Sequence, residues 1–152
     1  MKTITILLLT VFAVSINRCS SSDAKALKED LVFEYDAQTR GSFSKVIIKN
    51  DSLVVMEKSL TKGETINYYP LTDKDWKSLV KEVQKIDRNK IKSYEAPTAK
   101  RNTDAARATK TRVIYKQEVY ESNEFDEGAP PKEIKNLVDK IVSLYANAKK
   151  NK

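Results

Sequence analysis

The sequence contains no histidine, one cysteine, three glycines and one tryptophan among its 152 residues. The absence of histidine removes the commonest general base and the commonest metal ligand of proteins. A single cysteine allows neither an intrachain disulfide nor a cluster of thiolate ligands. Three glycines leave little room for a glycine-rich phosphate loop or a dinucleotide-binding fingerprint, and neither pattern occurs. Composition therefore excludes most familiar catalytic centres, and we expect no metal and no cofactor.

Charged residues are abundant but close to balanced. The chain has 28 Lys and Arg, 21 Asp and Glu, a net charge of +7, and a hydrophobic content of 40%. These values are typical of a soluble globular domain. Loss of residues 1–18 would leave 26 basic and 21 acidic residues, a charge of +5. We interpret this modest, dispersed excess as a solubility feature; attraction to an anionic envelope surface or a polyanion is the alternative.

Residues 1–18, MKTITILLLTVFAVSINR, have the pattern of a secretory signal peptide. Lys2 supplies a short positive region, and an apolar run follows from Ile4 to Ile16. At about 13 residues this run is too short to span a bilayer comfortably, whereas it suits the apolar core of a signal peptide. We therefore expect the protein to be exported.

Cys19 and the three serines after it resemble the start of a mature bacterial lipoprotein, in which the cysteine is acylated. Lipoprotein signals usually have a small residue before the cysteine, and this chain has Arg18. Ordinary cleavage after residues 13–15 is therefore the alternative. We expect acylation of Cys19 and anchoring of the protein to a membrane of the bacterial cell envelope.

The rest of the sequence predicts one domain between short polar ends. Residues 19–30 are polar, and we interpret them as a tether. Residues 31–148 contain the periodic apolar segments that a folded domain requires. The final residues, 149–152, read KKNK, and we predict a disordered basic tail.

The clearest secondary-structure signal is an amphipathic helix within residues 71–87, LTDKDWKSLVKEVQKID. Thr72 is suited to cap its N-terminus, with Asp75 in the capping-box position, and Leu71 and Trp76 occupy the positions of a hydrophobic staple. Apolar residues recur along one side at helical spacing, and the lysines fall on the other. The neighbouring strands must supply the surface that covers this apolar stripe.

Segments with strand character lie on both sides of this helix. Val46-Ile47-Ile48 predicts a strand that is covered on both faces or is central in its sheet. Residues 88–107 lack periodicity, and we expect Ile91 and Tyr94 to dock onto the core while the rest forms a polar loop. Alternation and turn residues predict strands at 31–35, 43–49, 53–58, 65–69, 108–116 and 117–122.

A second apolar stripe, from Ile134 to Tyr145, predicts a helix whose first turn contains Pro131. Both halves of the domain thus read as strands followed by an amphipathic helix. The sequence predicts an α+β fold: an antiparallel sheet of five or six strands with two amphipathic helices packed on one face, in ββ(β)α–ββα order.

Several segments together carry a family resemblance. They are YDAQTRGSF near the start, the tryptophan helix, EAPT followed by DAARAT, and FDEGAPPKEIKNLV near the end. In this combination the chain resembles a family of small exported lipoproteins of Bacteroidetes-type bacteria, over nearly the whole mature chain. The resemblance implies export and this fold but no chemistry, since the family has no established activity. The chain lacks the family's glycine after Asp104, and Glu127 stands where the family has histidine.

Asp104, Asp126 and Glu127 are the candidate carboxylate site. They lie in the two loops that flank the predicted 108–122 hairpin, so one end of the sheet could bring them together. Clustered carboxylates could bind a hard cation such as Ca²⁺ or divide into an acid and a base.

A structural role for the same carboxylates is the interpretation that we favour. Asp104 would cap a turn or pair with Arg101 or Arg107. Asp126 would accept hydrogen bonds from backbone amides of the turn at Gly128 and of the helix that follows.

Tyr68, Tyr69 and Tyr94 are candidates for a partner surface, because tyrosine is favoured at interfaces. Packing at the edge of the core is the alternative for all three. Arg101 and Arg107 belong to a basic stretch beside the 95–107 loop. This stretch has too few interleaved aromatic residues for a nucleic-acid module, and we expect no nucleic-acid partner.

These observations favour an envelope module that binds rather than catalyses, at the end of the sheet that carries loops 95–107 and 125–131. Its partner would be an unknown envelope protein or a secreted enzyme that it inhibits. The alternatives are a cation-dependent or hydrolase-like enzyme built on the three carboxylates, and a structural envelope component. A pocket joining the carboxylates, with raised pKa values, would favour the enzyme; individually paired carboxylates would favour the binding module.

Overall fold

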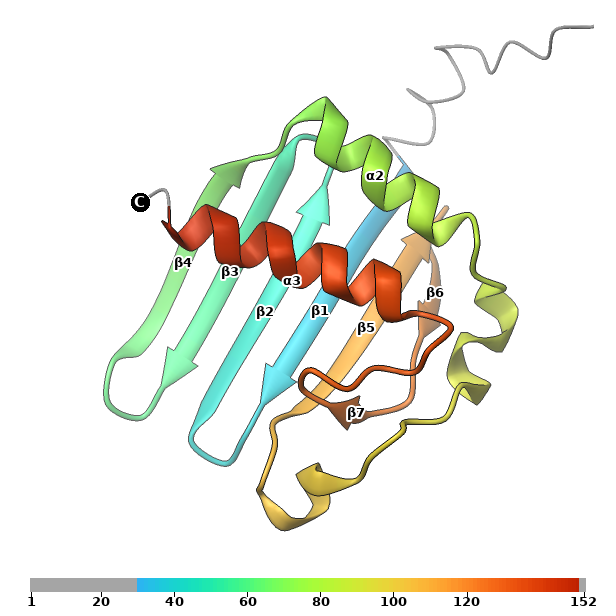
Figure 1. Cartoon of the computed structure of the whole chain (residues 1–152). Helices are drawn as coiled ribbons and strands as arrows, with labels where there is room; N and C mark the ends of the chain where they lie inside the picture. The colour runs from blue at the N-terminus through green and yellow to red at the C-terminus, as the bar shows by residue number, and fades with distance from the viewer. Residues whose placement is uncertain (1–29, 151–152) are drawn as a thin grey trace, which may run out of the picture.

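Figure 1 shows the computed structural model of the protein, which describes residues 30–150. One antiparallel sheet carries two α-helices on one face, so the predicted α+β fold is confirmed. The predicted signal peptide, the acylation site Cys19 and the tether up to residue 29 lie outside the described residues. The strands are β1 (Leu31–Gln38), β2 (Ser42–Lys49), β3 (Ser52–Ser59), β4 (Gly63–Pro70), β5 (Ala108–Tyr115), β6 (Glu118–Glu121) and β7 (Phe125–Asp126), and the helices are α2 (Asp73–Val83), α3 (Lys135–Lys150) and the 3₁₀-helices η1 (Arg88–Ser93) and η2 (Lys100–Thr103).

The first strand of the domain lies in the middle of the sheet. The strand order is β4-β3-β2-β1-β5-β6, and the short β7, which the sequence did not predict, pairs with β5. β1 pairs with β2 on one side, and on the other side it pairs with β5 from Leu31–Tyr115 to Gln38–Ala108. The β1–β5 pairing therefore joins the four-stranded N-terminal meander to the C-terminal half of the domain.

The helices cover only one face of this sheet. Phe33 on β1 contacts Trp76 on α2 edge to face, with ring centroids 5.7 Å apart. On β2, Val46 and Ile48 are buried toward the helices, whereas Ile47 points to the uncovered face and is half-buried. The triplet Val46-Ile47-Ile48 thus marks an interior strand, and the predicted alternative of cover on both faces is wrong.

Helix α2 begins as the sequence predicts. Thr72 Oγ1 accepts a hydrogen bond from the backbone N–H of Asp75 (3.2 Å) and donates to its carboxylate (2.7 Å). The helix ends at Val83 rather than near Asp87, because the last amides bond three residues back and tighten the turn. Asp87 instead caps η1, its carboxylate accepting from the N–H of Asn89 (3.2 Å), so the segment expected to be irregular starts with a 3₁₀-helix.

Helix α3 differs from its prediction at both ends. It begins at Lys135, because the N–H of Ile134 bonds to the carbonyl of Pro131 in a tight turn that precedes the helix. It continues through Lys150, so Lys149 and Lys150 are helical rather than part of a disordered tail. Neither this helix nor any other between residues 30 and 150 combines the length and the apolar character needed to cross a membrane.

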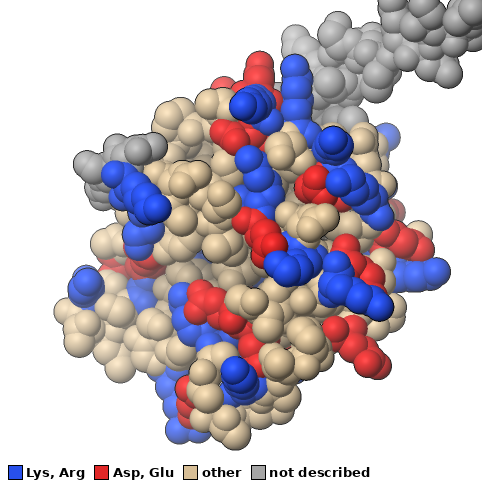
Figure 2. All heavy atoms as spheres, viewed as in Figure 1, with Lys and Arg blue, Asp and Glu red and all other residues tan. Residues whose placement is uncertain are grey.

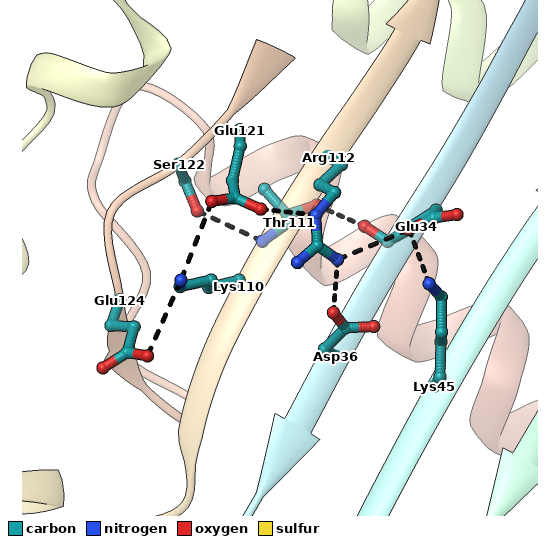
Figure 3. A network of polar contacts seen from close by, with 9 residues as sticks. All are labelled: Glu34, Asp36, Lys45, Lys110, Thr111, Arg112, Glu121, Ser122 and Glu124. Carbon is teal, nitrogen blue, oxygen red and sulfur yellow. Dashed lines mark hydrogen bonds and ion pairs between the residues drawn. The ribbon is translucent and has the colours of Figure 1, made fainter. Parts of the chain in front are cut away.

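The uncovered face of the sheet carries a network of ion pairs, seen in Figure 3 with α3 behind the strands. At its centre Arg112 on β5 binds Glu34 and Asp36 on β1 and Glu121 on β6. Because these residues lie side by side on three adjacent strands, the face that the helices leave open is polar along the middle of the sheet. The network comprises Glu34, Asp36, Lys45, Lys110, Arg112, Glu121 and Glu124.

Replacing Thr72 by alanine tests the cap of α2. The substitution removes the acceptor for the Asp75 amide, and we expect the free energy of unfolding to fall by about 1 kcal/mol in urea denaturation. Thr61→Ala is the matched control, since Thr61 is exposed in the β3–β4 turn, and we expect its effect to stay within about 0.5 kcal/mol. Equal stability of the two variants would contradict the role of the cap.

Candidate functional site

Asp126, on the short strand β7, is buried with a relative accessibility of 1%. Its carboxylate accepts hydrogen bonds from Thr98 Oγ1 (2.6 Å), from the backbone N–H groups of Lys100 (2.7 Å) and Arg101 (2.9 Å), and from Arg101 Nη1 (3.1 Å). All four donors belong to the loop before β5 rather than to the turn at Gly128 that the sequence suggested. Asp126 therefore fixes the 98–101 segment against β7.

Hydrogen bonding decides the ionisation of Asp126. Burial alone would raise the pKa of this carboxyl, but the bonds from Thr98, the two backbone amides and Arg101 outweigh burial and hold the pKa well below its ordinary value. An ionised carboxylate that is fully occupied by donors serves as a structural acceptor rather than as a general acid.

The other two candidate carboxylates have separate partners. Asp104 has a left-handed backbone at the end of η2 and pairs with Arg40 (3.3 Å), not with Arg101 or Arg107. Glu127 pairs with Arg107 (3.2 Å). Within residues 30–150 no three acidic side chains lie close enough together to hold a metal ion, so these carboxylates offer no assembled cation site.

The arginines of the same region and Lys110 are also paired with acidic side chains. Arg101 pairs with Asp126, Lys110 with Glu121, and Arg112 with its acidic neighbours across the sheet. Figure 2 shows acidic and basic side chains interspersed over the helix side of the molecule, without a large patch of one sign. We therefore interpret the basic stretch as a set of structural ion pairs.

The three candidate tyrosines differ in exposure. Tyr94 is half-buried against the core, and its hydroxyl donates to the carbonyl of Asp87 (3.2 Å). Tyr69 is half-buried and also packs on the core. Tyr68 points to the uncovered face beside Ile66 and is 74% exposed. Core packing thus accounts for Tyr69 and Tyr94, and only Tyr68 presents most of its ring to solvent.

A groove with a volume of about 480 Å³ opens on the helix side of the sheet, beside the C-terminal end of α3. Because α3 crosses the strands obliquely, it leaves uncovered the ends of β2, β3 and β4 that lie farthest from α2 (Figure 1). Strand β2 begins at this end and β3 turns into β4 there. The groove is lined by Ser42, Phe43, Ser44, Glu57, Lys58, Ser59, Lys62, Gly63, Thr65, Asn67, Arg107 and Lys149.

One wall of the groove is held by a carboxylate on β3. Glu57 accepts hydrogen bonds from Lys149 Nζ (2.7 Å) and from the hydroxyl of Tyr145 (2.5 Å), both on α3. The bonds from Lys149 and Tyr145 lower the pKa of Glu57, and the Glu57 carboxylate raises the pKa of Lys149. Both groups are therefore charged at neutral pH and tie the end of α3 to the sheet.

Arg107 holds the opposite wall. Its Nη2 donates to the carbonyl of Ala37 (2.5 Å) and to Ser44 Oγ (2.7 Å), and its Nη1 donates to Glu127 (3.2 Å). The Nε atom of Arg107 is buried and has no acceptor among the described residues. Arg107 thus connects the groove to the loops that the sequence had placed at this end of the sheet.

One further lysine lines the groove without an ion pair. Among residues 30–150 Lys62 has no acidic partner within salt-bridge distance. Lys58 borders the groove through its backbone, because its side chain points to the opposite face of the sheet from Glu57. The cationic side chains of the lining are therefore Arg107, Lys149 and Lys62, with the carboxylate of Glu57 among them.

Sequence reasoning identified one residue of the groove, Arg107, and missed the rest. Asp104, Asp126 and Glu127 do not line it. The serines and Thr65 lie on strands in which the alternation of apolar and polar residues predicts one face covered by a helix. No local pattern in the sequence shows how far along each strand that helix extends. The closest signal was the polar character of the strand ends near residues 42–44 and 57–65.

No protein-family model matches the chain, and a search of curated proteins finds no match. The function must therefore be argued from the geometry and chemistry of the site.

Asp126→Asn tests whether this carboxylate organises the loop before β5. The amide removes the charge and replaces one carboxylate oxygen by an NH2 group that faces the backbone N–H of either Lys100 or Arg101, so we expect a clear loss of thermal stability at pH 7 and faster hydrogen exchange at the amide that loses its acceptor. Asp104→Asn is the matched control, because the Asp104 side chain is 59% exposed. Similar stability and exchange in the two variants would contradict the proposed role.

The lowered pKa of Asp126 also predicts how the stability of the native protein, relative to Asp126→Asn, depends on pH. Because the pKa of Asp126 is lowered by folding, its stabilisation is fully present above the unfolded pKa of about 4 and is lost as the pH falls toward the folded value. The difference in melting temperature between the native protein and Asp126→Asn should be constant near neutrality and shrink below about pH 4. A difference that grows on acidification would contradict this assignment.

Proposed function

We propose that the protein is a non-catalytic binding module of the bacterial cell envelope, anchored to a membrane through acylated Cys19, with the groove beside α3 as its binding site. The observation that carries the proposal is the groove itself: strands β2, β3 and β4, Arg107 and helix α3 all contribute to it.

Ion pairs and hydrogen bonds that hold two lining side chains in place support binding by a preformed surface. Lys149 is held by Glu57, and Arg107 is held by Ala37, Ser44 and Glu127. Side chains that are fixed before a ligand arrives lose less conformational freedom on binding. The volume of the groove lies within the range of small-molecule sites in proteins.

The arrangement of the carboxylates favours this proposal over the hydrolase-like alternative. A general acid and base would need two carboxylates in one cleft, with environments that push their pKa values apart. Here Asp126 is surrounded by donors and has a lowered pKa, while Asp104 and Glu127 pair with separate arginines near the surface. Individually paired carboxylates of this kind are what we expect of a binding module.

An unknown envelope protein is the alternative partner. The observation that favours it is the exposure of Tyr68, beside Ile66, which is itself 48% exposed. Two neighbouring exposed residues on one strand form a smaller surface than the groove, so we propose the groove as the main binding site.

The intact mass of the protein from its native membrane fraction tests the anchor. We expect a chain that begins at Cys19 and carries the additional mass of acyl chains. Cys19→Ser should move the protein from the membrane fraction to the soluble fraction. A mature mass that begins near Ile16, with no acyl chains and a soluble distribution, would contradict the anchor.

A substitution that fills the groove tests its role as the binding site. Thr65 on β4 lines the groove, and Ile66 points to the opposite face of the sheet. We expect native mass spectrometry of the protein purified from its own envelope to show a bound small molecule, and Thr65→Trp to lose this additional mass. Ile66→Trp, the matched control, should retain it. Loss in both variants, or no additional mass in the native protein, would contradict the groove as a small-molecule site.

A further inference from the structure

We propose that the groove binds a small hydroxylated anion, of the class of sugars that carry a carboxylate or a phosphate. This inference rests on the proposed function, because it names the ligand class of the same groove.

The charge of the lining favours an anion. Arg107 and Lys149 are each balanced by one carboxylate, Glu127 and Glu57 respectively. Lys62 adds a positive charge that no acidic side chain balances among residues 30–150. A ligand with one negative charge would neutralise this excess, and a concave site concentrates the field of the cationic side chains on its occupant.

The guanidinium of Arg107 adds a directional contribution. An arginine has five N–H donors, and three of those on Arg107 are used in bonds to Ala37, Ser44 and Glu127. Of the other two, the Nε hydrogen is buried without an acceptor among the described residues, and the second is on Nη1, the atom that already binds a carboxylate oxygen of Glu127. Guanidinium donors are well suited to carboxylate and phosphate oxygens.

The hydroxyl groups of the lining favour a ligand that is itself rich in hydroxyls. Ser44 accepts from Arg107 and Ser59 accepts from the backbone N–H of Lys62, so the O–H of each serine is not used in that bond. Thr65 adds a third hydroxyl. Hydroxyls that both donate and accept match the hydroxyls of a sugar.

The composition of the lining argues against an apolar ligand. Phe43 is the one aromatic residue in it, and its ring points to the opposite face of the sheet from Ser42 and Ser44; apart from Gly63 the other lining residues are polar or charged. An acyl chain or a flat aromatic molecule would leave these serines and lysines without partners, which is costly once water is excluded. The expected ligand therefore carries polar groups that match these residues, and its carbon atoms can contact the aliphatic parts of the lysine and arginine side chains.

Calorimetric titration of the purified protein with four probes tests the ligand class. The probes are glucose 6-phosphate, glucuronate, glucose and inorganic phosphate, at pH 7 and low salt. We expect saturable binding of at least one sugar anion, and at least tenfold weaker binding of glucose and of inorganic phosphate. Amide chemical shifts should change at Ser44, Lys62 and Thr65 but not at Lys77, which is exposed on α2 away from the groove. Binding of only one sugar anion would identify the source of the charge as carboxylate or as phosphate.

Charge variants separate local recognition from the effect of net charge. Lys62→Gln should weaken binding of the sugar anion about two- to fivefold, in line with one partly exposed charge. Glu57→Gln removes a negative charge from the lining and should strengthen it. Lys77→Gln, on the exposed side of α2, makes the same charge change away from the groove and should alter affinity less than 1.5-fold. Equal effects of Lys62→Gln and Lys77→Gln would overturn local recognition.

The other outcomes of the titration distinguish the proposed ligand class from the proposal that the groove is a binding site. Glucose that binds as tightly as the sugar anions would overturn the anionic class, and inorganic phosphate that does so would overturn the hydroxylated class. If none of the four probes binds at millimolar concentration, the proposal of a hydroxylated, anionic ligand is overturned as a whole. In each case a bound mass that Thr65→Trp removes and Ile66→Trp retains would still support the groove as a binding site.

Discussion

The pairing of β1 with β5 is the constraint on which the rest of the domain depends. It joins residues that are 70 (Gln38 and Ala108) to 84 (Leu31 and Tyr115) positions apart, along the whole length of both strands. The register places Arg112 directly opposite Glu34 on the uncovered face, where the ion-pair network forms. It also brings Arg107, the residue before β5, to the carbonyl of Ala37 near the end of β1. One backbone pairing thus positions both the polar centre of the open face and one wall of the groove.

The number of helices explains why the two faces of the sheet differ. Two α-helices cover one face of the seven-stranded sheet among the described residues, and the uncovered face meets water with charged side chains along its centre (Figure 3). On the covered face, α3 crosses the strands obliquely and leaves the ends of β2 to β4 open. The groove is therefore a geometric consequence of incomplete cover on the helix side, and it is polar because Ser59 and Thr65 occupy positions that α3 does not cover.

The candidate site shows where sequence reasoning has physical limits. The three carboxylates were recognised as candidates, and their pairing with arginines and amides was the favoured interpretation. Their partners were assigned to neighbours in the chain, whereas Asp126 binds a loop 25 to 28 residues away and Asp104 binds Arg40. The hydrogen-bond partners that lie close in the chain can be read from the sequence. Which distant donor a carboxylate binds depends on which loops the fold brings together.

The sequence by itself determined the α+β class, most strand positions, the cap of α2 and the apolar stripes of both helices, because periodicity and capping are local properties. The tertiary structure alone decided that the first strand is central, that a two-residue strand carries Asp126, and that α3 stops short of covering the ends of β2 to β4. These features depend on strand order and on the angle at which a helix crosses a sheet. Both are set by packing between segments far apart in the chain, so no local pattern records them.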